Sequence, residues 1–115
     1  MPSGNPAARR IEHRVAGGDI NPYLMVAGVL GAALVGMEDG LAPPPPITGN
    51  AYAQDLPQLP ASWAEAVDRF ETSPLMARIF APELIRNLVL TKRQELHYMA
   101  ELSPEEVIEL YLDTV

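Results

Sequence analysis

Residues 8–15 read ARRIEHRV, and charged side chains alternate with other side chains along most of this stretch. Because successive side chains of a β-strand point to opposite faces, a strand here would carry Arg10, Glu12 and Arg14 in one row. Its other face, with His13 and two aliphatic side chains, would meet a buried layer. The sequence therefore predicts one N-terminal strand over residues 8–15.

The rest of the chain offers helices and loops but no second clear strand. A strand must pair, since its backbone N–H and C=O groups are otherwise unmatched. We therefore expect the partner strands to come from another chain or from an upstream part of a longer protein. The predicted fold class is α+β, with one N-terminal strand followed mostly by α-helices.

The next segment, residues 22–39, is predicted to be a helix that is apolar nearly all round. Asn21 can cap its first turn, Pro22 suits the first helical position, and Gly40 suits a left-handed residue after its end. The uncharged run over residues 22–37 would span only about 24 Å, short of the roughly 30 Å hydrocarbon core of a bilayer. We therefore expect a packed helix and no membrane segment.

Proline and serine divide the remainder of the chain. Four consecutive prolines, residues 43–46, mark residues 41–60 as a long extended loop. Residues 62–114 are predicted to be helical, with Ser-x-x-Glu capping boxes beginning at Ser62 and Ser103. Apolar residues recur there every three or four positions, which indicates core packing rather than contacts with a cofactor.

The composition limits the class of protein. A chain of 115 residues and 12.5 kDa is one small domain or a piece of a larger one. A net charge of −7 argues against a nucleic-acid or anionic-membrane surface. The lack of cysteine excludes disulfides, thiolate metal sites and a cysteine nucleophile, and favours a cytoplasmic location.

The charged row of the predicted strand is compatible with two roles. In a structural role, Glu12 pairs with neighbouring arginines on an exposed surface. In a functional role, Glu12 coordinates a hard cation through a carboxylate oxygen, and Arg10 and Arg14 bind carboxylate or phosphate oxygens. Spacing alone does not separate these roles. The two histidines, His13 and His97, lack metal-ligand spacing and are expected in core or surface positions.

Two blocks, RIEHR at residues 10–14 and GDINPYL at residues 18–24, together resemble the end of the catalytic domain of the glutamine synthetase family. In that family an Ala/Gly-rich helix, a Pro-rich loop and a helical segment follow these blocks, as they do here. The resemblance covers essentially the whole chain. It implies that residues 1–115 are a C-terminal portion of such a catalytic domain, completed by the remainder of the domain or by full-length subunits.

The resemblance also implies an activity, the ATP-dependent joining of ammonia or an amine to the γ-carboxyl of glutamate through γ-glutamyl phosphate. By position, Glu12 looks like a ligand of an active-site Mg²⁺ or Mn²⁺. Arg14 looks like the catalytic arginine that binds the glutamate substrate and the reacting phosphoryl group, and Arg10 like the one near the nucleotide phosphates. The complete enzyme would be a homo-oligomer. The isolated chain is expected to be inactive, because the family's other metal ligands lie upstream.

Smaller features suggest a branch of the family, and one alternative function remains open. The Glu-His-Arg block and the LYL at residues 110–112 look more like γ-glutamylpolyamine synthetases than ammonia-using enzymes. Tyr52 lies in a segment similar to the loop whose tyrosine is adenylylated in some bacterial glutamine synthetases, but the Ala-Gln at residues 53–54 departs from that pattern. The alternative function is a non-enzymatic helical interaction module that needs a partner to complete its sheet.

Overall fold

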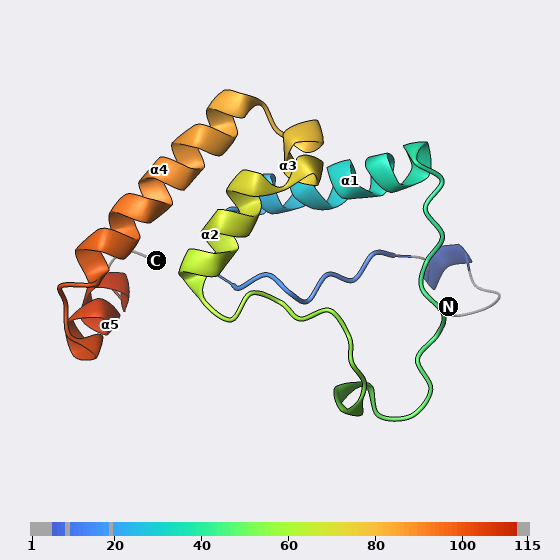
Figure 1. Cartoon of the computed structure of the whole chain (residues 1–115), viewed down its shortest axis with the longest axis horizontal. Coiled ribbons are helices and arrows are strands. Elements are labelled where there is room, and N and C mark those ends of the chain that lie inside the picture. The colour runs from blue at the N-terminus through green and yellow to red at the C-terminus, as the bar shows by residue number, and fades with distance from the viewer. Residues whose placement is uncertain (1–5, 9, 19, 113–115) are drawn as a thin grey trace.

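The computed structural model describes residues 6–8, 10–18 and 20–112, and their regular structure is entirely helical. Two short 3₁₀ helices, η1 and η2, and five α-helices follow one another along the chain (Figure 1). Their bounds are η1 Pro6–Ala8, α1 Pro22–Glu38, η2 Ala51–Ala53, α2 Trp63–Thr72, α3 Pro74–Ile79, α4 Pro82–Met99 and α5 Pro104–Leu112.

The predicted strand over residues 8–15, and with it the α+β fold class, is wrong. Ala8 ends η1, residue 9 lies outside the described residues, and residues 10–15 belong to no strand. Figure 1 shows this segment as an extended trace passing below the helices. No second strand exists among the described residues to pair with it, and an extended segment without a partner forms no ladder of hydrogen bonds. The expectation of a mostly helical chain agrees with the structure.

Proline and side-chain caps determine where the helices begin. Proline is the first residue of α1, α3, α4 and α5, where its missing N–H costs no intrahelical hydrogen bond. The Asn21 side chain caps α1 by accepting hydrogen bonds from the N–H groups of Tyr23 and Leu24, at 3.0 and 3.2 Å. Gly40 follows the end of α1 with a φ of 60°, a left-handed conformation that glycine adopts without strain.

The two capping boxes differ in one contact. Before α5, Ser103 and Glu106 cap each other, since the Ser103 N–H donates to the Glu106 carboxylate and the Glu106 N–H donates to the Ser103 hydroxyl. Before α2, Ser62 accepts from the Glu65 N–H, but the Glu65 carboxylate accepts from the Ala61 N–H. In each case a backbone N–H is the main cause that lowers the pKa of the glutamate.

The helices pack as two pairs, α1 with α3 and α2 with α4 (Figure 1). Val67 of α2 and Val89 of α4 are buried in the second pair, and Val35 of α1 is buried in the first. These three are the only buried residues in the part of the chain that the structure describes. The chain therefore forms a helical layer with a small core, and much apolar surface stays exposed.

Ion pairs at the surface connect the two helices of each pair. Arg93 of α4 contacts Asp68 and Glu71 of α2, with its Nη2 atom at 2.8 and 2.6 Å from carboxylate oxygens. Arg78 of α3 contacts the carboxylates of Glu38 and Asp39 at the end of α1, at 3.1 and 2.6 Å. Within the described residues, no helix is both long enough and apolar enough to cross a membrane.

Candidate functional site

The charged row predicted from the sequence forms a cluster even though its backbone is not a strand. The Arg14 Nε donates to Glu12 Oε1 at 2.6 Å, and the Arg14 Nη2 also pairs with this oxygen. The Arg10 Nε lies 3.7 Å from the other carboxylate oxygen, Glu12 Oε2. An extended backbone places residues two apart on the same side, so the contacts need no neighbouring strand. We call these three residues the Arg-Glu-Arg cluster.

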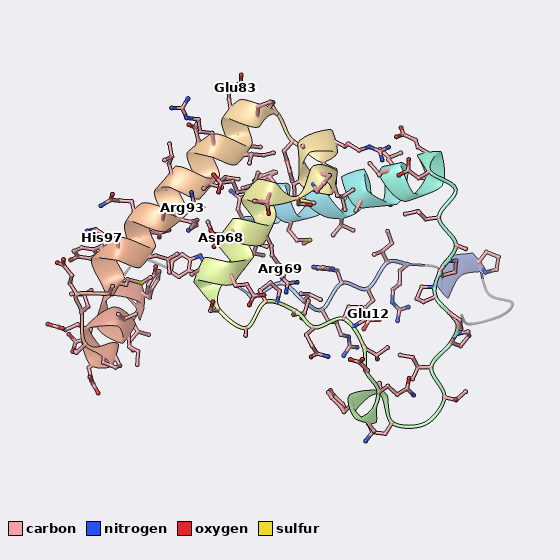
Figure 2. All side chains as sticks on the ribbon, in the orientation of Figure 1. Glu12, Asp68, Arg69, Glu83, Arg93 and His97 are labelled. Atoms are coloured by element: carbon pink, nitrogen blue, oxygen red, sulfur yellow. The ribbon has the colours of Figure 1, made fainter. Side chains whose placement is uncertain are left out.

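The cluster lies on the surface of the extended segment that precedes α1. All three residues are exposed, and Figure 2 shows Glu12 apart from the packed pair of α2 and α4, which carry Asp68 and Arg93. Both Glu12 oxygens face guanidinium groups. The geometry is therefore that of an exposed ion-pair triad, and the metal, nucleotide and substrate roles of Glu12, Arg10 and Arg14 stay predictions.

No metal site is formed by the described residues alone, because they contain no group of three or more possible His, Cys, Asp or Glu ligands. The two histidines are not brought together. His13 lines a groove beside α1, whereas His97 lies in the last turn of α4, far from Glu12 (Figure 2). Any divalent cation bound near Glu12 would therefore need oxygen ligands from outside this part of the chain.

The groove that contains His13 is a concave surface with a volume of about 1360 Å³. It runs between α1, together with the segment before it, and the helices α2, α3, α4 and α5, and its lining is mainly apolar, including Leu24, Met25 and Phe80. Because it is open to solvent and contains few polar groups, it is better suited to covering by another apolar surface than to binding a charged substrate.

Sequence reasoning did not find a polar cluster at one end of this groove. The Lys92 Nζ lies 5.5 Å from the centroid of the Trp63 ring and 2.6 Å from Glu95 Oε2. The Tyr111 hydroxyl donates to Glu95 Oε1 at 3.4 Å. Only the three-residue spacing of Lys92 and Glu95 was visible in the sequence. The cluster joins α2, α4 and α5, and its charges neutralise one another, which fits a structural role.

Tyr52 is held at an exposed position in the long loop. Its side chain is fully accessible, and its N–H donates to the Asn50 side chain at 3.1 Å at the start of η2. The Gln54 side chain donates to the Thr48 carbonyl and closes the same turn. The turn therefore presents the tyrosine hydroxyl to solvent.

Comparison with known proteins identifies the family. Residues 1–111 match the family model described as glutamine synthetase, catalytic domain. The chain therefore belongs to the glutamine synthetase family, and the resemblance carried by residues 10–24 is confirmed. No solved structure matches the chain significantly.

Curated relatives include enzymes named for different amine products or substrates. The chain is 40% identical over 93 residues to the gamma-glutamylethanolamide synthetase of Streptomyces coelicolor, covering 81% of this chain and 20% of the relative. It is 34% identical over 122 residues to the glutamine synthetase of Aquifex aeolicus, covering 98% and 26%. It is 35% identical over 112 residues to the glutamate–isopropylamine ligase of a Pseudomonas species, covering 95% and 24%. The chain thus spans about a fifth to a quarter of the length of these relatives.

Proposed function

We propose that this chain is the C-terminal part of the catalytic domain of an ATP-dependent glutamate–amine ligase. The complete enzyme would join ammonia or an amine to the γ-carboxyl of glutamate through γ-glutamyl phosphate. The family match over residues 1–111 and the names of the relatives support this proposal. The activity belongs to the complete domain, because the chain corresponds to only about a quarter of such enzymes.

The observation that carries the proposal is the Arg-Glu-Arg cluster. In the complete enzyme Glu12 would give one carboxylate to an active-site Mg²⁺ or Mn²⁺, a hard cation that prefers oxygen ligands. Arg14 would bind the glutamate substrate and the reacting phosphoryl group, and Arg10 would bind the nucleotide phosphates. A planar guanidinium suits both tasks because its paired N–H groups match carboxylate and phosphate oxygens.

The cluster by itself does not fit a complete metal site. Glu12 is a single carboxylate with both oxygens on arginines, and the described residues supply no group of three ligands. ATP and the metal would therefore be held mainly by the rest of the catalytic domain. The isolated 115-residue chain should accordingly show no ATP-dependent formation of γ-glutamyl amides. Activity of the purified chain alone would contradict this expectation.

The proposal also covers the amine substrate, the oligomeric state and the cellular location of the complete enzyme. The relatives include glutamine synthetases as well as enzymes named for ethanolamide, isopropylamine and putrescine products or substrates. The 40% identity to the ethanolamide enzyme supports an amine other than ammonia, in line with the branch suggested by the sequence. We infer a cytoplasmic homo-oligomer. Assay of the complete enzyme with ammonia, ethanolamine, isopropylamine and putrescine in parallel tests the substrate class, and a preference for ammonia would contradict it.

The role of Glu12 is tested in a chimeric ligase, in which this chain replaces the matching 26% of the Aquifex aeolicus glutamine synthetase. Glu12→Gln keeps the shape of the side chain but removes its charge. We expect kcat/KM to fall by about 10²-fold or more, because charged groups at a transferring phosphoryl centre act on the transition state. The Mg²⁺ or Mn²⁺ concentration for half-maximal activity should rise as well.

The matched control is Glu83→Gln, which removes the same charge from the first turn of α4, well away from Glu12 (Figure 2). It should leave kcat/KM and the metal dependence unchanged. Equal behaviour of the two variants would instead assign the Arg-Glu-Arg cluster a purely structural role.

A further inference from the structure

One face of α1 carries a row of large apolar side chains exposed to solvent. Their exposed fractions lie between 47% and 84%, and their spacing of three or four residues places them along one side of the helix. We call this row the α1 stripe, formed by Tyr23, Val26, Leu30, Leu34 and Met37.

The opposite side of α1 is already occupied. A Cβ atom added at Gly31 would clash with the Ile79 side chain, and one added at Gly28 would lie 3.7 Å from Phe80. At about 3.6 residues per turn, Gly28 lies opposite the α1 stripe and Gly31 lies about a quarter turn to one side of it. Neither side of α1 is charged, since residues 22–37 contain no Asp, Glu, Lys or Arg. A helix that is apolar all round is typical of a protein interior.

The comparisons indicate what covers the stripe. The family model that matches residues 1–111 describes a catalytic domain, and the relatives extend to about four or five times the length of the matched segment. The surface that meets the stripe must itself be apolar, because no charge on residues 22–37 is available to pair with it.

We propose that the α1 stripe is the surface through which this chain docks against the rest of a glutamine synthetase-type catalytic domain. The assignment rests on the proposed function and adds to it the docking surface and its partner. It gives α1 two interfaces, one with α3 inside the chain and one with the part of the domain outside these 115 residues.

The test compares two leucines of equal exposure. Leu30 on the stripe is 53% exposed and Leu90 on α4 is 55% exposed. The tagged chain is co-expressed with the part of the Aquifex aeolicus glutamine synthetase that lies outside the matched 26% of its length, and the amount recovered with the tag is measured. We expect recovery with the wild-type chain and with Leu90→Gln, and at least a ten-fold lower recovery with Leu30→Gln.

Folding is monitored separately. Both substitutions replace an exposed leucine by a good helix former, so circular dichroism of the purified chains should be unchanged. If Leu30→Gln lowers the helical signal, Leu34→Gln at the next stripe position replaces it in the comparison. Undiminished recovery with the stripe variants, or no recovery with the wild-type chain, would overturn the docking assignment.

Two further outcomes are distinguishable. A wild-type chain that forms a dimer in sedimentation experiments, with Leu30→Gln monomeric, would assign the stripe to a second copy and overturn the proposal. A recovered complex that depends on Leu30 but makes no γ-glutamyl amide would leave the docking surface intact and contradict the proposed function.

Discussion

α1 and α4 have nearly the same length, 17 and 18 residues, but they meet solvent in different ways. α4 is amphipathic, and α2 covers its apolar side so well that Val89 is only 2% exposed. α1 has no charged residue before Glu38, and its glycine side packs on α3 while the α1 stripe faces solvent. A helix whose apolar side matches its neighbour is complete within this chain, whereas one that is apolar all round needs a larger protein around it.

The same negative charge placed on both helices should affect their stability very differently. Val89→Asp would bury an unpaired carboxylate between α4 and α2 and should lower the free energy of unfolding by about 3–5 kcal/mol. Val26→Asp on the α1 stripe should change it by no more than about 0.5 kcal/mol in the isolated chain, because the new carboxylate stays in water.

Urea unfolding followed by circular dichroism measures both values. Similar losses for the two variants would mean that the stripe is covered within the chain itself, and the contrast between α1 and α4 would then disappear.

A smaller effect is expected at the glycines of α1. Gly31→Ala forces a methyl group against Ile79 of α3 and should destabilise the chain by about 1–3 kcal/mol. Gly36→Ala is the matched control, because no atom lies within 4 Å of the added Cβ. That change should stabilise the helix by roughly 0.5–1 kcal/mol, since alanine is the better helix former. Thermal unfolding of both variants tests this, and a neutral Gly31→Ala would show that α3 does not contact α1 so closely.

The smallest effect concerns the ion pair at the end of α1. A hydrogen bond from Arg78 lowers the pKa of Asp39 below its ordinary value of 3.8. The unfolded chain therefore binds more protons than the folded chain between the two pKa values. The stabilisation is present above about pH 4 and is lost as the pH falls through the folded pKa. The unfolding midpoint should fall modestly between pH 5 and pH 2.5, and salt should weaken the effect because both groups are exposed.

Asp39→Asn separates the contribution of Asp39 to this pH dependence from the contributions of other carboxylates. The variant should be slightly less stable than the wild type at pH 7 and equally stable at the acidic end. The pH dependence that remains would come from carboxylates such as Glu65 and Glu106, whose pKa values are lowered by backbone N–H groups. A difference between wild type and variant that is constant with pH would contradict the role of Asp39.

The helix starts were readable from the sequence because they depend on neighbouring residues. Asn21 and Ser103 cap helices through hydrogen bonds that span only two or three positions, and proline at the first helical position needs no distant contact. The same holds for the Arg-Glu-Arg cluster, because residues two apart on any extended backbone face the same side.

The predicted strand failed because a strand is not a local structure. The alternating pattern of residues 10–15 is consistent with an extended backbone, but the hydrogen bonds of a sheet come from another strand, and the described residues contain none. The Lys92–Trp63 and Glu95–Tyr111 contacts were missed for a related reason. They join α4 to α2 and to α5, and only the packing of these helices brings the residues together.

The caps before α1, α2 and α5, the neutral apolar character of α1 and the family of the chain all follow from the amino-acid sequence alone. Which apolar sides are covered depends on the packing of the helices, because burial is set by the shape and position of a neighbour. Val89 is buried against α2, Gly31 contacts the Ile79 side chain of α3, and Leu30 is exposed to solvent. All three are apolar in the sequence, and only their neighbours in space separate a core position from a docking surface.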